Sequence, residues 1–287
     1  MAECNVCFRH CKLSEGQTGF CGARECRGGR VIAANYGKIT AIALDPIEKK
    51  PLNRFFPKSM ILSVGSYGCN LRCPFCQNSD ISWSARAFEY KSNAQTVTPE
   101  ELLSLALKYQ PQGNIGAAFT YNEPLTGYEF VRDTARLIHQ AGMKNVLVTN
   151  GTAQLHVLEE LAPYIDAMNI DLKGFDKHYY NKTLGGDMDM VLAFIRRAVQ
   201  LCHTELTTLV VTGENDSEEQ MREIVGFISS LTDERGNVIG KSIPLHISRF
   251  FPRFKMTDRA PTDVSLIYRL ADIARERLDY VYVGNCP

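Results

Sequence analysis

Three cysteines in one short stretch carry the strongest chemical signal in the sequence. The stretch reads Cys69-Asn70-Leu71-Arg72-Cys73-Pro74-Phe75-Cys76, a C-x3-C-x2-C spacing. With 10 cysteines in 287 residues, random placement would give about 0.01 such matches per chain. Three soft thiolates suit an iron–sulfur cluster, and a cubane that needs one ligand per iron would keep one iron open. A zinc knuckle or three reduced thiols are the alternatives, although zinc would normally require a fourth local ligand.

This loop resembles the signature of the radical S-adenosylmethionine (SAM) enzymes. The resemblance implies a [4Fe–4S] cluster on Cys69, Cys73 and Cys76, whose open iron binds the amino and carboxylate groups of SAM. It also implies that Phe75 lies against the adenine side of the cofactor. Residues 45–52, 63–78 and 119–124 resemble the pyruvate formate-lyase activating enzyme-like branch, and within it the radical SAM member of the AmmeMemoRadiSam group.

The same resemblance implies a reaction. Reductive cleavage of SAM to a 5′-deoxyadenosyl radical would be followed by removal of hydrogen from a substrate, such as a glycine Cα of a partner glycyl radical enzyme. A flavodoxin or ferredoxin is the expected one-electron reductant. Radical modification of another peptide, a metabolite or an RNA is an alternative on the same scaffold. A non-catalytic iron–sulfur electron carrier and a zinc-dependent binding module are alternatives of other classes.

Polar residues follow several expected strands, where a parallel α/β fold places its functional groups. Glu123 is either a solvated loop carboxylate or, as the resemblance implies, the acceptor of the SAM amino group. Asp171 and Lys173 share one face of a strand and form either a structural ion pair or contacts to the SAM ribose and carboxylate. His246 is either a core histidine or a neighbour of SAM. Asn122 and Thr149 stand at the same strand ends and are expected to bind the cofactor as well.

A second cysteine group lies near the N-terminus. Cys4, Cys7, Cys11 and Cys21 offer four thiolates within 18 residues. Four soft ligands suit a closed tetrahedral zinc site or a second iron–sulfur cluster, and the spacing alone leaves both open. Cys26 is more readily a bystander than a substitute ligand.

Strand and helix signals alternate after residue 58. The expected strands are 61–67, 115–120, 145–149, 167–172, 206–211 and 244–248, with 280–283 as a terminal strand. The expected helices are 99–109, 128–140, 155–161, 191–201, 217–231 and 264–278. This alternation predicts an α/β fold with a parallel sheet. The resemblance selects a partial (β/α)6 TIM-like barrel at 59–287, preceded by a small Cys-rich metal-binding module at 1–58.

Composition narrows the class of protein. Apolar residues make up 45% of the chain, and 32 basic residues balance 32 acidic ones. The zero net charge argues against a strongly basic nucleic-acid binder. A membrane helix is not expected, because no run of about 18 apolar residues occurs. No apolar signal segment follows Met1, so we expect the reducing cytoplasm, where clustered cysteines bind metals more often than they form disulfides.

Overall fold

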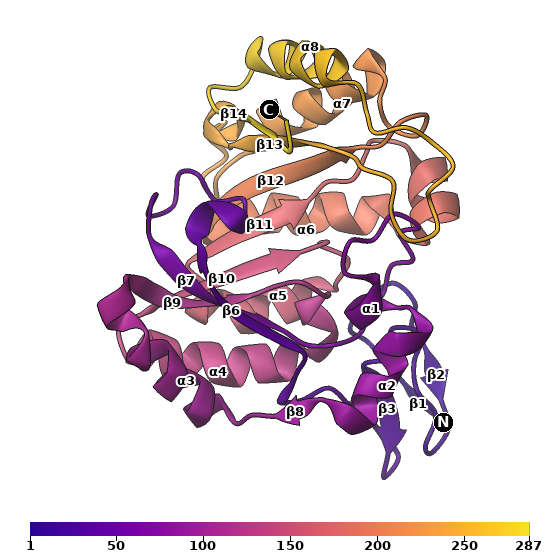
Figure 1. Cartoon of the computed structure of the whole chain (residues 1–287), viewed down its shortest axis with the longest axis vertical. Coiled ribbons are helices and arrows are strands. Elements are labelled where there is room, and N and C mark those ends of the chain that lie inside the picture. Colours follow the sequence, from indigo (N-terminus) through magenta and orange to yellow (C-terminus); the bar gives the residue numbers. More distant parts are fainter. Residues whose placement is uncertain (287) are drawn as a thin grey trace.

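One eight-stranded sheet organises the computed structural model, which describes residues 1–286. Its strands run in the order β14-β13-β12-β11-β10-β9-β7-β6 (Figure 1). The seven strands from β7 to β14 are parallel, whereas β6 pairs antiparallel with β7. The bounds are β6 (Ala41–Pro46), β7 (Met60–Gly65), β9 (Asn114–Phe119), β10 (Lys144–Thr149), β11 (Ala167–Asp171), β12 (His203–Val210), β13 (Leu245–Arg249) and β14 (Val281–Gly284).

Helices connect successive strands and pack along the outside of the sheet (Figure 1). The α-helices are α1 (Ser79–Ser82), α2 (Ala85–Asn93), α3 (Pro99–Lys108), α4 (Tyr128–Gln140), α5 (Leu155–Leu161), α6 (Met188–Leu201), α7 (Glu218–Ser229) and α8 (Val264–Arg275). Shorter 3-10 turns are η1 (Ile47–Lys49), η2 (Gln110–Gln112), η3 (Pro124–Gly127), η4 (Ala162–Tyr164) and η6 (Gly240–Ser242), and η5 (Tyr179–Leu184) is a π-helix. Within residues 1–286, none of the helices has the length and apolarity needed to cross a bilayer.

The predicted α/β partial-barrel fold is confirmed. Each predicted strand and helix of the repeating part is present, and a capping box between Thr98 and Glu101 begins α3. Helix α6 begins earlier than predicted because Asp187 caps it by accepting a hydrogen bond from the Met190 N–H at 3.1 Å. Strand β12 also begins earlier, since His203 pairs with Ala167 of β11.

A segment before β7 closes the barrel at the amino ends of its strands. Ile47, Leu52 and Phe55 pack against inward-facing side chains of β7, β9, β10 and β11, and this group forms its own buried cluster. In Figure 1 the segment lies at the end of the sheet opposite to α1 and α2. Residues 47–55 therefore form a floor, and the carboxyl ends of the strands form the open side.

The N-terminal residues form small two-stranded sheets beside the open side (Figure 1). Their strands are β1 (Ala2–Glu3), β2 (Lys12–Leu13), β3 (Arg24–Arg27) and β4 (Arg30–Ala33), and β5 (Lys38–Ile39) pairs with β8 (Gln95–Thr96). A buried Arg24 joins this part to α4 through an ion pair with Glu129 at 2.7 Å. The division at residue 58 stays a prediction, although β6, on its N-terminal side, is hydrogen-bonded into the main sheet.

Gly68 lies where the N-terminal part packs most closely against the loop after β7. Its φ is +95°, and an added Cβ would lie 2.7 Å from both the Ala23 Cβ and the Cys21 carbonyl oxygen. We expect Gly68→Ala to lower the free energy of unfolding by about 2–5 kcal/mol, from backbone strain plus the clash. Gly28 is the matched control, because its φ is +58° and no atom lies within 4 Å of an added Cβ. Urea titrations would contradict the prediction if both variants lost the same stability.

Candidate functional site

A large pocket opens at the carboxyl ends of the strands. Its volume is about 670 Å³, in the range of small-molecule and cofactor sites. The structure brings every site residue that was predicted in the barrel to its wall, namely Cys69, Cys73, Phe75, Cys76, Asn122, Glu123, Thr149, Asp171, Lys173 and His246. The four N-terminal cysteines do not line this pocket.

Distant parts of the chain hold the cysteine loop between β7 and α1. The Cys69 N–H donates to the Cys21 carbonyl at 3.1 Å, and the Arg72 N–H donates to the Leu184 carbonyl at 2.7 Å. On the other side, the Lys255 N–H donates to the Pro74 carbonyl at 2.9 Å. These backbone bonds fix a loop that has no regular secondary structure of its own.

The three thiols of the loop are buried in a way that disfavours free thiolates. Burial raises the pKa of all three, that of Cys73 to about 11. Bound metal would stabilise them as thiolates at neutral pH. Every cysteine of a cubane binds its own iron, so three soft donors in one loop suit a cluster with one open iron.

Glu123 is a carboxylate held inside the protein wall. It is 2% exposed and accepts hydrogen bonds from the Thr149 hydroxyl at 2.7 Å and from the Asn150 N–H at 2.8 Å. The Leu125 N–H is a third donor, at 3.0 Å. Burial is the largest influence and raises the pKa of Glu123 to about 7 in spite of these bonds. In the part of the chain that the structure describes, no Lys, Arg or His forms an ion pair with it.

Two of the predicted cofactor residues have structural partners of their own. The Thr149 hydroxyl is directed to Glu123, as described above. The Asn122 side chain accepts from the Ser66 N–H at 3.0 Å and donates to the Gly68 carbonyl at 3.1 Å. Asn122 therefore shapes the turn that leads into Cys69. Contact of either residue with a cofactor stays a prediction.

Asn150 joins the cluster loop to Glu123, and the sequence interpretation gave it no role. Its side chain donates to the Asn70 Oδ1 at 2.9 Å and lies 3.7 Å from the Cys69 sulfur. The available signal was its place in Thr149-Asn150-Gly151, directly after a strand at the edge where the site was expected.

Asp171 and Lys173 form the ion pair that their shared strand face predicted, at 2.8 Å. Burial lowers the pKa of Lys173, but the Asp171 carboxylate and the Cys73 sulfur outweigh it, and the net pKa is raised. The ammonium group is therefore charged at neutral pH, on the pocket wall near the cysteine loop. It suits an anionic group of a ligand.

His246 is both a buried residue and part of the pocket wall. It is 6% exposed, and its ring stacks on Tyr282 with centroids 5.1 Å apart. Its Nε2 lies 2.6 Å from an oxygen of Glu205, which is fully buried on β12. Glu205 was missed by the sequence interpretation, although a carboxylate in the interior of a central strand is a signal for a specific partner.

Glu205 also fixes the floor of the pocket. Its two oxygens accept the Arg54 and Asn53 N–H groups at 2.7 and 3.0 Å. The His203 Nε2 is a further partner at 3.0 Å. One carboxylate thus ties a pocket histidine to the segment that closes the barrel.

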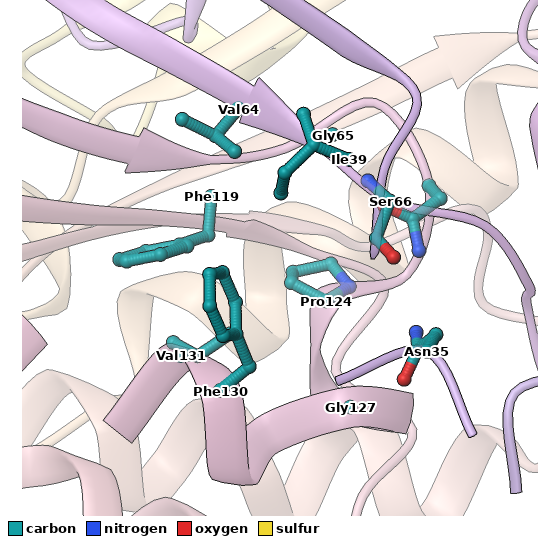
Figure 2. Close-up of a pocket in the computed structure, with 11 residues that line it drawn as sticks. Asn35, Ile39, Val64, Gly65, Ser66, Phe119, Pro124, Gly127, Phe130 and Val131 are labelled. Atoms are coloured by element: carbon teal, nitrogen blue, oxygen red, sulfur yellow. Dashed lines mark hydrogen bonds between the residues drawn. The ribbon is translucent and has the colours of Figure 1, made fainter. Parts of the chain in front are cut away.

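A second, much smaller pocket lies between the β7–β9 edge and α4 (Figure 2). Phe119, Pro124, Phe130 and Val131 are among its lining residues, and its volume is about 20 Å³. That is room for about one water molecule. The Oδ1 of Asn35, labelled in Figure 2, lies beside Gly127 and is a buried oxygen without a protein donor. This cavity is too small for a cofactor.

Acid stability should depend on Glu205. Burial would raise its pKa, but the four donors around it lower the pKa from 4.5 to about 2. Because the folded-state pKa is depressed, the stabilisation is complete above pH 4.5 and is lost as pH falls toward 2. We expect Glu205→Gln to lose on the order of 3 kcal/mol near pH 7 and much less near pH 3.

Urea unfolding at the two pH values measures this difference, and Glu223→Gln, an exposed change on α7, is the control. A loss in Glu205→Gln that does not vary with pH would contradict the assignment.

Comparison with known proteins agrees with this geometry. The sequence model of the Radical SAM superfamily matches residues 63–225. An uncharacterized protein of Methanocaldococcus jannaschii is 39% identical over 288 residues, which cover 99% of this chain and 81% of that protein. The 4-hydroxyphenylacetate decarboxylase activating enzyme of Clostridioides difficile is 22% identical, with 74% of this chain and 70% of the enzyme covered. The pyruvate formate-lyase-activating enzyme of Clostridium pasteurianum is 26% identical, with 57% and 67% covered.

Solved structures share the fold at low identity. Streptococcus suis SuiB bound to S-adenosylmethionine matches with a TM-score of 0.57 and 15% identity, over 77% of this chain and 48% of SuiB. QueE from Escherichia coli matches with a TM-score of 0.53 and 11% identity, over 86% of this chain and 92% of QueE.

Proposed function

The chain belongs to the radical SAM superfamily, and from that premise we propose that it activates a partner glycyl radical enzyme by removing hydrogen from a glycine Cα. The family implies a [4Fe–4S] cluster and SAM. When bound, these supply the electron and the sulfonium whose cleavage gives methionine and a 5′-deoxyadenosyl radical. The activating-enzyme relatives support the choice of substrate class.

The chain's own residues would bind and orient the two cofactors. Cys69, Cys73 and Cys76 hold the cluster. Glu123 receives the SAM ammonium, and Lys173 receives an anionic group of SAM, because charge-assisted hydrogen bonds of this kind are the strong ones. The other predicted wall residues, which are Phe75, Asn122, Thr149, Asp171 and His246, complete the cofactor site.

The observation that carries the cofactor assignment is the buried carboxylate of Glu123 beside the cysteine loop. A buried acid without a cationic protein partner is costly, and its raised pKa records that cost. An ammonium group from a ligand would favour the charged form and supply the missing partner. Asp171, in contrast, already has Lys173.

The shape of the pocket supports a substrate that is part of a larger molecule. The floor formed by residues 47–55 closes the amino ends of the strands, and the pocket opens at the other end. Its wall beyond the cysteine loop carries Glu48, Lys49 and Asn53 from the floor segment, which are groups able to hydrogen-bond a peptide backbone. A loop of a partner protein could reach the cofactor from the open side.

Isotope transfer tests the proposed reaction. The reconstituted protein would be incubated without oxygen with SAM, a one-electron reductant such as flavodoxin, and a short synthetic peptide containing a central dideuterated glycine. We expect deuterium in the 5′-deoxyadenosine that forms, because the radical removes a Cα hydrogen. Formation of unlabelled 5′-deoxyadenosine alone would contradict a glycine substrate, and Cys73→Ala should form none.

SAM affinity tests the role of Glu123. We expect Glu123→Gln to raise the Kd for SAM about 10- to 100-fold, since a charge-assisted hydrogen bond contributes about 1.5–3 kcal/mol. Isothermal titration of the cluster-loaded protein measures this change. Glu100→Gln, an exposed carboxylate change at the start of α3, is the matched control. Unchanged affinity in a folded Glu123→Gln variant would refute the assignment.

A further inference from the structure

The N-terminal cysteines form a second metal site that the pocket does not use. We propose that Cys4, Cys7, Cys11 and Cys21 hold a second iron–sulfur cluster, placed directly against the loop of Cys69. This inference goes beyond the proposed function and does not require a glycyl radical partner.

The fold brings the four thiols together from two turns. Pairing of β1 with β2 places Cys4 opposite Cys11, and the Cys4 N–H donates to the Cys11 carbonyl at 2.9 Å. Cys7 lies in the connection between them. The Cys11 sulfur is 3.7 Å from the Cβ position of Gly19, which starts the turn that leads to Cys21.

Three of these thiols are buried. Cys4, Cys7 and Cys21 are 6, 8 and 7% exposed, and all are free of disulfide bonds. Bound metal would link the short segments that carry them, which have little core of their own.

The number of ligands in the quartet matches a closed cluster. Four cysteines, one for each iron, would complete a closed [4Fe–4S] cluster with no open corner.

The two cysteine groups adjoin each other. The Cys21 carbonyl accepts from the Cys69 N–H at 3.1 Å, so residues of both groups share a hydrogen bond. A second hydrogen bond joins the groups through the residues next to them. Arg9, which lies between Cys7 and Cys11 in the chain, donates from Nε to the carbonyl of Asn70 at 3.0 Å, and Asn70 directly follows Cys69.

A variant that cannot bind the cluster of Cys69, Cys73 and Cys76 would show the proposed N-terminal cluster alone. We expect the triple variant Cys69→Ala, Cys73→Ala, Cys76→Ala, reconstituted without oxygen, to keep about four irons and four sulfides per chain, against about eight of each in the unchanged protein. After reduction it should give the electron paramagnetic resonance signal of one isolated cluster. In the unchanged protein, the same signal should be broadened by the adjoining cluster.

Single changes in the triple variant then test the ligands. Cys7→Ser and Cys21→Ser should remove the remaining iron, whereas Cys26→Ser should keep it. Cys26 is the matched control because it is buried in β3 of the same part of the chain, with its sulfur facing Glu15 at 4.0 Å.

Three results would overturn the proposal: a triple variant without iron, a triple variant with one zinc in place of iron, or loss of the cluster in Cys26→Ser. The triple variant leaves the N-terminal cysteines unchanged, so the test holds even if the Cys7 and Cys21 variants fail to fold. Failure of the glycine reaction would appear in the isotope experiment and would leave these metal contents unaffected.

Discussion

The need to hold three buried sulfurs in an irregular loop governs the rest of the structure. A loop without ladder hydrogen bonds has to satisfy its backbone groups elsewhere. Here Cys69 and Arg72 bond to carbonyls of Cys21 and Leu184, and Pro74 accepts from Lys255. The N-terminal part, the η5 turn and the segment after β13 therefore each contribute to the position of the same short stretch. Glu123 and Asn150 connect that stretch to β9 and β10.

The two acids on the pocket wall differ in how far the protein compensates their charge. Asp171 has an ammonium partner on the next residue of the same strand face, and the pair is complete within the protein. Glu123 has only neutral donors, so its charged form is poorly compensated. Within the described residues, the pocket therefore contains one ion pair that is complete and one carboxylate, that of Glu123, without a cationic partner. This asymmetry would orient a zwitterionic ligand, because its cationic end would meet the unpaired carboxylate.

Sequence pattern was sufficient for the repeating part of the fold and for the wall of the pocket. Period-two alternation placed Asp171 and Lys173 on one face, and both line the cavity. The carboxyl-end rule gathered Glu123, Thr149 and His246 from three strands.

The local sequence pattern could not predict contacts between residues that are far apart in the chain. Asn53 meets Glu205 across 152 residues, and Asn70 meets Asn150 across 80. Nothing within the β6 segment indicated that it would join the main sheet, because its pairing with β7 is decided by the edge that β7 exposes. The starts of α6 and β12 were also set by a cap and by a neighbouring strand.

The floor of the barrel has a consequence for how the chain is made. Ile47, Leu52 and Phe55 leave the ribosome before any of the parallel strands that will surround them. The carboxylate that fixes Asn53 is translated 152 residues later, an interval of roughly 8–30 s at common rates of synthesis. The apolar partners on β7, β9, β10 and β11 are made within this interval, but the carboxylate that fixes Asn53 and Arg54 is still missing. Final closure of the floor therefore waits until β12 has been synthesised.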